Sequence, residues 1–238
     1  MKTVNKGKLY GVGVGPGDPE LITLKALRII KENKYIAFPA KNREDTITCH
    51  IVESLLENTD DKVFLDCHVQ MTKDRKLLDD NYNVIVQKIT KLLDAGENVV
   101  FLTIGDPTVY STYMYIHRMI KERGYDTEII NGITSFCAAA GRMEISLAER
   151  EEELHIIPAS YDTGKALKYP GNKILMKMGS KLSDIKKKLE ETDDEVYMIE
   201  NCSLNNEKIY KSVQEIDINS GYMSVIIVKE KSGGVIHE

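Results

Sequence analysis

A buried strand that stops abruptly at a Gly-Asp-Pro turn is the feature that most restricts the fold of this chain. Residues 99–104 are almost entirely apolar, and Gly105-Asp106-Pro107-Thr108 follows them directly, with a helix start expected at Ser111 or Thr112. In open α/β folds, small-molecule sites lie at the carboxyl ends of strands, in turns of this kind. Glycine lets a ligand approach the backbone, aspartate supplies an acceptor and proline stiffens the loop. The turn therefore predicts a ligand site.

A second turn of the same kind lies near the N-terminus. Residues 11–19 read Gly-Val-Gly-Val-Gly-Pro-Gly-Asp-Pro and also follow a predicted strand, so the two turns suggest one ligand held between loops. A dinucleotide-binding fingerprint needs a third glycine five positions after the first, but Pro16 and Asp18 stand there. The sequence also lacks Gly-Lys-Ser/Thr, which excludes a P-loop, and the failed glycine spacing disfavours a dehydrogenase.

The order of predicted elements indicates an α/β fold. Up to residue 130, short apolar strands alternate with amphipathic helices, which is typical of a mainly parallel sheet. The strongest of these helices is expected over residues 82–93. The second half carries predicted strands and one helix between two of them, at residues 154–158, 173–178, 195–200, 222–229 and 181–191. We therefore expect two α/β domains, residues 1–130 with a mainly parallel sheet and residues 131–238 with a mixed sheet.

Composition and charge narrow the class of protein. The chain has 42% apolar residues but no apolar run near the ~20 residues of a membrane span, and its polar start lacks a signal-peptide core, so we expect a soluble cytoplasmic protein without membrane partners. The net charge of −5 argues against nucleic-acid binding. The four cysteines are expected as free thiols. Cys49-His50 and Cys67-His68 could supply zinc ligands in principle, but adjacent residues rarely reach one ion, and no metal is expected.

Three glycine-bounded segments resemble the tetrapyrrole (corrin/porphyrin) methylase family. They are residues 11–26, residues 105–112 and Gly132-Ile-Thr-Ser-Phe136, and they occur in the family's order over nearly the whole chain. Further segments are most similar to the branch that methylates C20 of precorrin-2 or of cobalt-factor II in cobalamin biosynthesis: residues 101–112, 134–140, 156–158, 175–178 and the pair Met71-Thr72. One departure is Asn131, where the family usually has proline; asparagine tolerates turn geometry.

The resemblance implies a homodimeric enzyme of two α/β domains that holds S-adenosyl-L-methionine in the cleft between them. The cofactor contacts carried over by matching positions are Val14 and Pro16 in the first loop, Gly105, Asp106, Val109 and Tyr110 in the second, Thr134, Ser135 and Phe136 in the third, and, more weakly, Met178, Asn201, Met223 and Ser224. Met178 fits a core position about as well as a cofactor contact. Because the methyl group leaves a sulfonium, the reaction depends mainly on alignment. Tyr110, His68 and Glu200 are candidates to accept the C20 proton, and Tyr110 is the catalytic residue we predict.

A small-molecule tetrapyrrole carries many carboxylates, so an acidic protein must bind it through local positive charge. The candidates are Lys41, Arg43, Lys73, Arg75 and Arg142, each of which could pair with a carboxylate or simply be an exposed basic residue. Two alternatives stay open. One is another enzyme of the same family, acting at a different ring position or on a protein side chain. The other is a non-enzymatic tetrapyrrole-binding protein, which would leave three converging loops unexplained.

Overall fold

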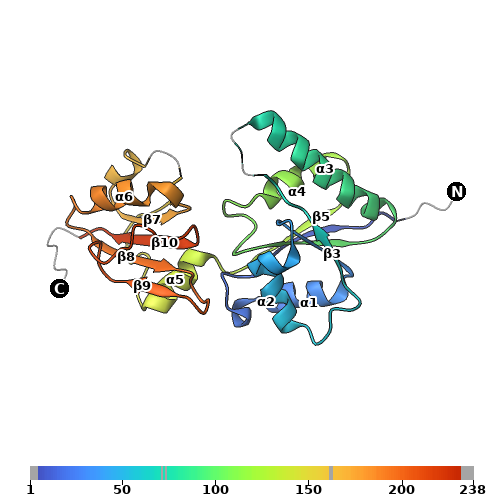
Figure 1. Cartoon of the computed structure of the whole chain (residues 1–238), viewed down its shortest axis with the longest axis horizontal. Helices are drawn as coiled ribbons and strands as arrows, with labels where there is room; N and C mark the ends of the chain where they lie inside the picture. Colours follow the sequence, from blue (N-terminus) through green and yellow to red (C-terminus); the bar gives the residue numbers. More distant parts are fainter. Residues whose placement is uncertain (1–4, 71, 73, 161–162, 232–238) are drawn as a thin grey trace. The chain divides into compact units, whose positions relative to one another are not determined.

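The chain forms two compact units, Met1–Thr134 and Ser135–Glu238, each built on its own five-stranded sheet (Figure 1). This computed structural model describes residues 5–70, 72, 74–160 and 163–231. Within these residues, no helix combines the length and the apolar character needed to cross a membrane.

The first unit contains a parallel sheet with the strand order β3-β2-β4-β1-β5. Its strands are β1 (Leu9–Gly13), β2 (Tyr35–Phe38), β3 (Val63–Asp66), β4 (Val99–Thr103) and β5 (Thr127–Ile130). The helices that connect them are α1 (Leu24–Glu32), α2 (Ile47–Leu55), α3 (Arg75–Asp94) and α4 (Tyr113–Glu122). The parallel N-terminal sheet expected from the sequence is therefore confirmed.

Helices cover both faces of this sheet. The central strand β4 is buried at every position, as expected for a parallel strand with helices on both sides. Its side chains alternate: Val99 and Phe101 join the core formed with α3 and α4, whereas Val100 and Leu102 join the core formed with α1 and α2. Figure 1 shows the two helix pairs on opposite sides of the strands. The unit thus has three layers.

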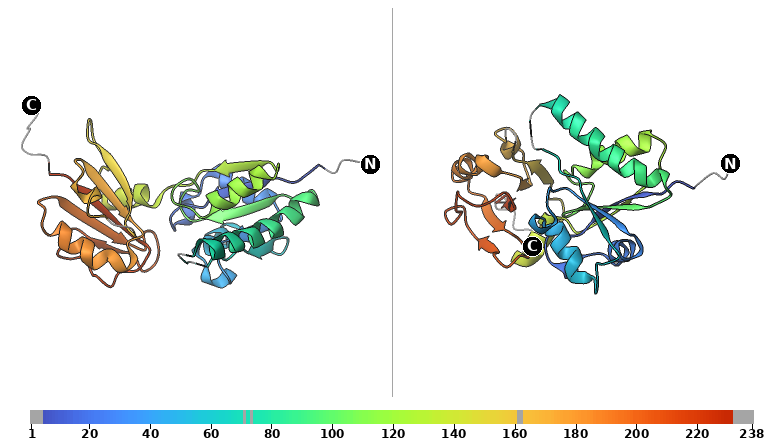
Figure 2. Two further views of the ribbon diagram at one scale, coloured as in Figure 1. Left: turned by 90° about the horizontal axis from the view of Figure 1, so that it is seen from above. Right: turned by 45° about the vertical axis from the view of Figure 1, so that its right-hand side comes forward.

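The second unit contains a mixed sheet with the strand order β6-β7-β10-β8-β9, also as expected. Only β6 and β7 run parallel, and the other neighbours are antiparallel. Helix α6 (Leu182–Leu189) packs on one face of this sheet (Figure 2), and α5 (Ser135–Met143) contacts β10. The strands are β6 (Leu154–Pro158), β7 (Asn172–Met176), β8 (Glu195–Glu200), β9 (Lys208–Tyr210) and β10 (Ser224–Lys229).

Several elements differ from the sequence-based boundaries, and for α3 and β7 the reason is identifiable. Helix α3 begins at Arg75 rather than at residue 82, because the Asp74 side chain accepts hydrogen bonds from the backbone N–H groups of Lys76 and Leu77. The added turns are mostly exposed, so they lack the apolar periodicity on which the prediction relied. Strand β7 ends at Met176 rather than at residue 178, because Lys177 adopts a left-handed backbone with φ of 57°.

A close packing contact explains Gly11, one of the glycines in the N-terminal run. The fully buried ring of Tyr113 in α4 packs against strand β1 and lies 5.5 Å from the Phe101 ring, measured between centroids. A Cβ atom on Gly11 would lie 2.0 Å from Cε1 of Tyr113. Glycine at this position is therefore required by core packing, without reference to a ligand.

We expect Gly11→Ala to lower the free energy of unfolding of the first unit by roughly 1–3 kcal/mol or more, because a buried ring must move to make room. Urea unfolding followed by circular dichroism measures the effect. Gly141→Ala is the matched control, since a Cβ there meets no atom within 4 Å and lies in a helix, where alanine stabilises by up to about 1 kcal/mol. Equal effects of the two substitutions would contradict the packing explanation.

Candidate functional site

The three predicted loops of the first unit meet at one edge of its sheet. Strands β4, β1 and β5 are adjacent and parallel, so the segments that follow them emerge side by side. The backbone N–H of Gly105 donates to the carbonyl of Gly15 at 2.7 Å, and that of Val14 donates to Thr103 at 3.0 Å. The first and second loops are therefore hydrogen-bonded to each other directly beyond the strand ends.

Glycines allow the backbones of these loops to touch. A Cβ on Gly13 would lie 2.4 Å from the carbonyl oxygen of Gly105, and a Cβ on Gly132 would lie 2.2 Å from the same oxygen. Gly105 itself has φ of 68°, and Gly15 has φ of 80°, a region that side chains disfavour. The spacing of these glycines, which fits no dinucleotide fingerprint, is explained by the contact of three backbones around one carbonyl group.

Asp106 fastens the second loop to the third. Its side chain is 7% exposed. One carboxylate oxygen accepts hydrogen bonds from the N–H and the hydroxyl of Thr108, at 2.7 and 2.5 Å. The other accepts from Nδ2 of Asn131 and from the N–H of Gly132, both at 3.0 Å. Both oxygens are thus used within the protein, which gives this predicted cofactor contact a positioning role as well.

The hydrogen bonds change the acidity of this carboxyl group. Burial raises the pKa of Asp106, but the hydrogen bonds from Thr108, Asn131 and Gly132 outweigh burial and lower that pKa below the ordinary value of an aspartate. Asn131 also accepts a long hydrogen bond from the Thr23 hydroxyl at its carbonyl, at 3.4 Å. The asparagine that departs from the family pattern therefore ties its own turn to two neighbouring loops.

Tyr110 has an unusual backbone at the end of the second loop. Its φ is 47°, which is uncommon for a residue other than glycine, and its side chain is 42% exposed. Such strain concentrates at ligand sites, where the surrounding structure enforces it. Near the end of the third loop, the buried hydroxyl of Thr134 has no hydrogen-bond partner among the described residues. Both observations suit the predicted contacts, which stay predictions.

Three of the predicted residues of the second unit, Asn201, Met223 and Ser224, meet at one end of its sheet. Because β10 runs antiparallel to β7 and β8, its start lies beside their ends: Ser224 pairs with Glu200, and Val225 with Met176. The backbone N–H of Asn201 donates to the carbonyl of Met223 at 2.8 Å. Asn201 also has a positive φ of 53°. Residues far apart in sequence are thus brought together at this edge.

Burial separates these second-unit residues into two groups. Met178, at 3% exposed, packs in the core under α6, and Ser224 is equally buried. Met178 therefore contributes to the core, and its role as a cofactor contact stays a prediction. Asn201 and Met223 are half-buried. In α5, Ser135 is half-buried and Phe136 is buried.

The predicted substrate-binding residues differ in whether they already pair with an acidic residue of the protein. Arg43 is engaged inside the protein: it pairs with Glu53, donates to Thr59, and stacks over the Phe64 ring with its guanidinium carbon 3.7 Å from the centroid. Arg142 pairs with Glu207 at 2.7 Å. The remaining candidates are exposed or not placed: Lys41 and Arg75 are exposed, and Lys73 lies outside the described residues.

Lys177 is a basic residue that was not predicted from the sequence, and it lies where the end of β7 meets the start of β10. It follows β7 directly and is half-buried, and burial lowers the pKa of its ammonium group. The sequence did not mark Lys177 as a residue at a strand end, because the predicted strand ran over residues 173–178 and enclosed it. Its left-handed backbone could not be foreseen from its residue type.

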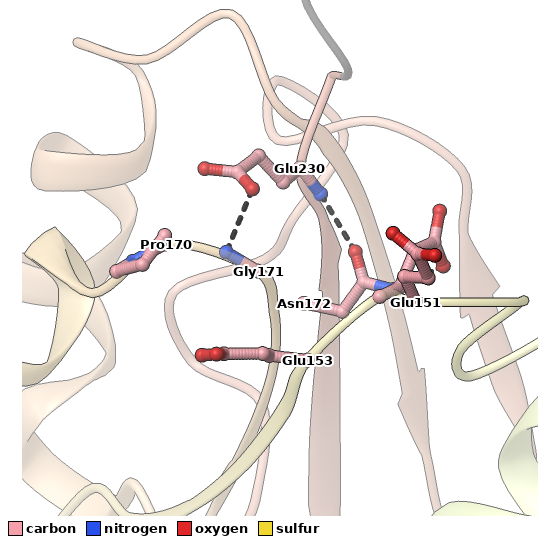
Figure 3. A pocket seen from close by; sticks show the side chains of 7 residues that line it. Glu151, Glu153, Pro170, Gly171, Asn172 and Glu230 are labelled. Atoms are coloured by element: carbon pink, nitrogen blue, oxygen red, sulfur yellow. Dashed lines mark hydrogen bonds between the residues drawn. The ribbon is translucent and has the colours of Figure 1, made fainter.

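A pocket at the opposite end of the second sheet has unsuitable chemistry for a polyanion. Figure 3 shows Glu230 accepting a hydrogen bond from the N–H of Gly171, at 2.7 Å, and donating its own N–H to Asn172, at 3.0 Å. These residues lie at the start of β7 and the end of β10. Four glutamates contribute to the lining, and the full set is Glu151, Glu152, Glu153, Pro170, Gly171, Asn172 and Glu230. None of the predicted site residues belongs to it.

We expect Asp106→Asn to lower the free energy of unfolding at pH 7 by roughly 1–3 kcal/mol. The substitution replaces one accepting oxygen by an amide NH₂ group, which then faces N–H or O–H donors without an acceptor. The folded-state pKa lies below the unfolded value, so the carboxylate stabilises the fold above about pH 4 and loses this effect as the pH falls through the folded-state pKa. Urea unfolding between pH 7 and pH 3 should show the difference narrowing. The exposed Asp79→Asn is the control; a difference independent of pH would contradict the interpretation.

Comparison with known proteins supports the resemblance over nearly the whole chain. The family model described as Tetrapyrrole (Corrin/Porphyrin) Methylases matches residues 8–217. A Methanocaldococcus jannaschii protein named "Probable cobalt-precorrin-2 C(20)-methyltransferase" is 35% identical in an alignment of 232 positions that covers 93% of this chain and 96% of that protein. A Sinorhizobium sp protein named "Precorrin-2 C(20)-methyltransferase" is 28% identical in an alignment of 241 positions that covers 96% of this chain and 97% of that protein.

A solved structure shares the fold. The uroporphyrin-III C-methyl transferase from Thermus thermophilus, complexed with S-adenyl homocysteine, superposes with a TM-score of 0.67 at 21% identity, covering 94% of this chain and 98% of that one. The two sheets of this chain and its match to the family model agree with the expected fold class. The converging loops, the sequence match and this fold lead to one conclusion: the chain belongs to the tetrapyrrole (corrin/porphyrin) methylase family.

Proposed function

We propose that this protein is an S-adenosyl-L-methionine-dependent C-methyltransferase that methylates C20 of precorrin-2 or cobalt-factor II in cobalamin biosynthesis. The observation that carries the proposal is the 35% identity, over 93% of the chain, with a relative named for C20 methylation of the cobalt-containing compound. The second relative is named for the same carbon of precorrin-2. The position of methylation is therefore better supported than the metal content of the substrate.

The loops of the first unit offer groups that suit a nucleoside methyl donor. In the first unit, the loops after β1, β4 and β5 offer backbone groups at a strand edge, and the Thr134 hydroxyl has no internal partner in the described part of the chain. We propose these contacts: Val14, Pro16, Gly105, Asp106, Val109, Tyr110, Thr134, Ser135, Phe136, Met178, Asn201, Met223 and Ser224. When bound, the methyl donor supplies a methyl group on a sulfonium, which leaves as a neutral thioether.

The protein's own residues then have two tasks. The glycine-bounded loops, held in register by Asp106 and Asn131, orient the reactants, and alignment supplies much of the rate when the leaving group is good. A proton must leave C20, and we propose Tyr110 as the residue that assists, because its side chain is exposed beside the second loop on a strained backbone. We further propose a cytoplasmic homodimer, following the family resemblance.

On the substrate side, we propose Lys41, Lys73 and Arg75 as the partners of tetrapyrrole carboxylates. Lys41 and Arg75 are exposed, and the latter begins α3. Arg43 and Arg142 remain candidates, but each already pairs with a glutamate, so a substrate carboxylate would have to replace that partner. Because the chain carries a net charge of −5, such basic residues must act locally.

The proposed activity is tested by incubating the protein with S-adenosyl-L-methionine labelled with ¹³C at the methyl group, together with metal-free precorrin-2 or cobalt-factor II. We expect a single new methyl resonance, assigned by carbon NMR to C20, with one of the two substrates preferred. Methylation at another ring carbon would support a different member of the family. Methyl transfer to neither substrate, although the cofactor binds, would contradict the proposal.

A second test concerns the basic residues near the start of α3. We expect Lys73→Ala combined with Arg75→Ala to raise the substrate KM roughly tenfold or more, while the affinity for S-adenosylhomocysteine changes little, because lost charge pairs affect only the carboxylate-rich partner. Lys91→Ala, exposed in the last turn of the same helix, is the control. If the KM of the double variant equals that of the control, the substrate binds elsewhere.

A further inference from the structure

The carboxylate of Glu200, the last residue of β8, is buried and only partly satisfied. The side chain is 8% exposed. Its Oε1 atom accepts a hydrogen bond from the backbone N–H of Gly221, at 2.5 Å. Its Oε2 atom is buried and has no hydrogen-bond partner among the described residues. Leaving a buried charged oxygen unpaired is costly, so its partner is expected to come from outside this part of the chain.

Glu200 lies on the core-facing side of β8, where a buried carboxylate is unexpected. Along β8, Val196 and Met198 point into the core under α6, and the alternation of a strand puts Glu200 on the same face. Ser224 on β10, which pairs with Glu200, lies on the same face of the sheet as the core residue Ile226. A carboxylate and a serine thus form the last row of a face whose other rows are apolar, where hydrophobic residues would satisfy packing alone.

Two residues next to Glu200 and Ser224 in the sheet have a left-handed backbone. Asn201, which follows Glu200, and Lys177, which follows β7, both have positive φ values, of 53° and 57°. Residues held in this region of backbone conformation cluster at ligand sites, where the surrounding structure enforces it. Met223 lies half-buried in the segment that Glu200 holds through Gly221, and its thioether offers a polarizable apolar surface of the kind that accepts a purine.

We propose that Glu200 is a ligand-binding residue: its Oε2 atom accepts a hydrogen bond from the nucleoside part of the bound methyl donor, either from a ribose hydroxyl or from the adenine amino group. Both groups are donors, and a carboxylate oxygen accepts from either. At the same time, Oε1 holds the segment Gly221–Met223 in place. This inference rests on the proposed function, because it presupposes the nucleoside cofactor.

The test is calorimetric titration of S-adenosylhomocysteine and of 5′-methylthioadenosine, which lacks the amino-acid part, into the protein and into Glu200→Gln. Glutamine keeps a carbonyl oxygen for Gly221 but replaces the free acceptor by an amide donor. We expect Glu200→Gln to weaken both ligands by a similar factor, roughly tenfold to hundredfold. Glu195→Gln, an exposed position at the other end of β8, is the matched control and should leave both affinities unchanged.

The outcomes separate this inference from the proposed function. Unchanged affinity of Glu200→Gln for both ligands, or weakening of S-adenosylhomocysteine alone, overturns the nucleoside contact while the proposed function stands. Failure of the unaltered protein to bind S-adenosylhomocysteine overturns both. Thermal unfolding of Glu200→Gln should stay within a few degrees of the unaltered protein. If Glu200→Gln loses affinity because it is unfolded, Glu200→Asp serves as the second variant: partial recovery of both affinities supports the contact, and no recovery in a folded Glu200→Asp overturns it.

Discussion

The candidate site of the first unit depends on the close packing of its loops around the carbonyl group of Gly105. Two neighbouring loops approach it so closely that no side chain fits at Gly13 or Gly132. The approach is possible because three parallel strands end at one edge, and it is maintained because the Asp106 carboxylate accepts four hydrogen bonds, two of them from the loop after β5. The loops are therefore one hydrogen-bonded assembly, in which each backbone depends on the others.

In the second unit, antiparallel strands bring residues that are distant in sequence to one end of the sheet. Here the ends of β7 and β8 meet the start of β10, so Lys177, Glu200, Asn201 and Ser224 come to one edge from three separate stretches of sequence. Two residues with a left-handed backbone lie there, together with a buried carboxylate of which one oxygen has no hydrogen-bond partner in the described part of the chain. At the other end of this sheet, glutamates line a pocket whose charge disfavours an anionic ligand.

Several predictions from the sequence rested on signals that are local. Alternating strands and amphipathic helices indicated the parallel sheet of the first unit, because burial on both faces leaves an apolar run such as residues 99–103. The Gly-Asp-Pro turns were recognised from residue type alone. The start of α3 was missed because exposed turns carry no periodicity, and β9 was missed because it is a short, largely exposed strand.

The sequence by itself determined the fold class, the family and the loops that would carry a ligand site, because each depends on short-range patterns. Only the tertiary structure decided what individual side chains do. Arg43 pairs with Glu53, on the helix that follows it. Gly11 must be glycine because the ring of Tyr113 packs against it, and Asp106 is held by Asn131 and Gly132, which are partners distant in sequence. Whether a polar atom is satisfied depends on such distant neighbours, which is why Glu200 became informative only once its surroundings were known.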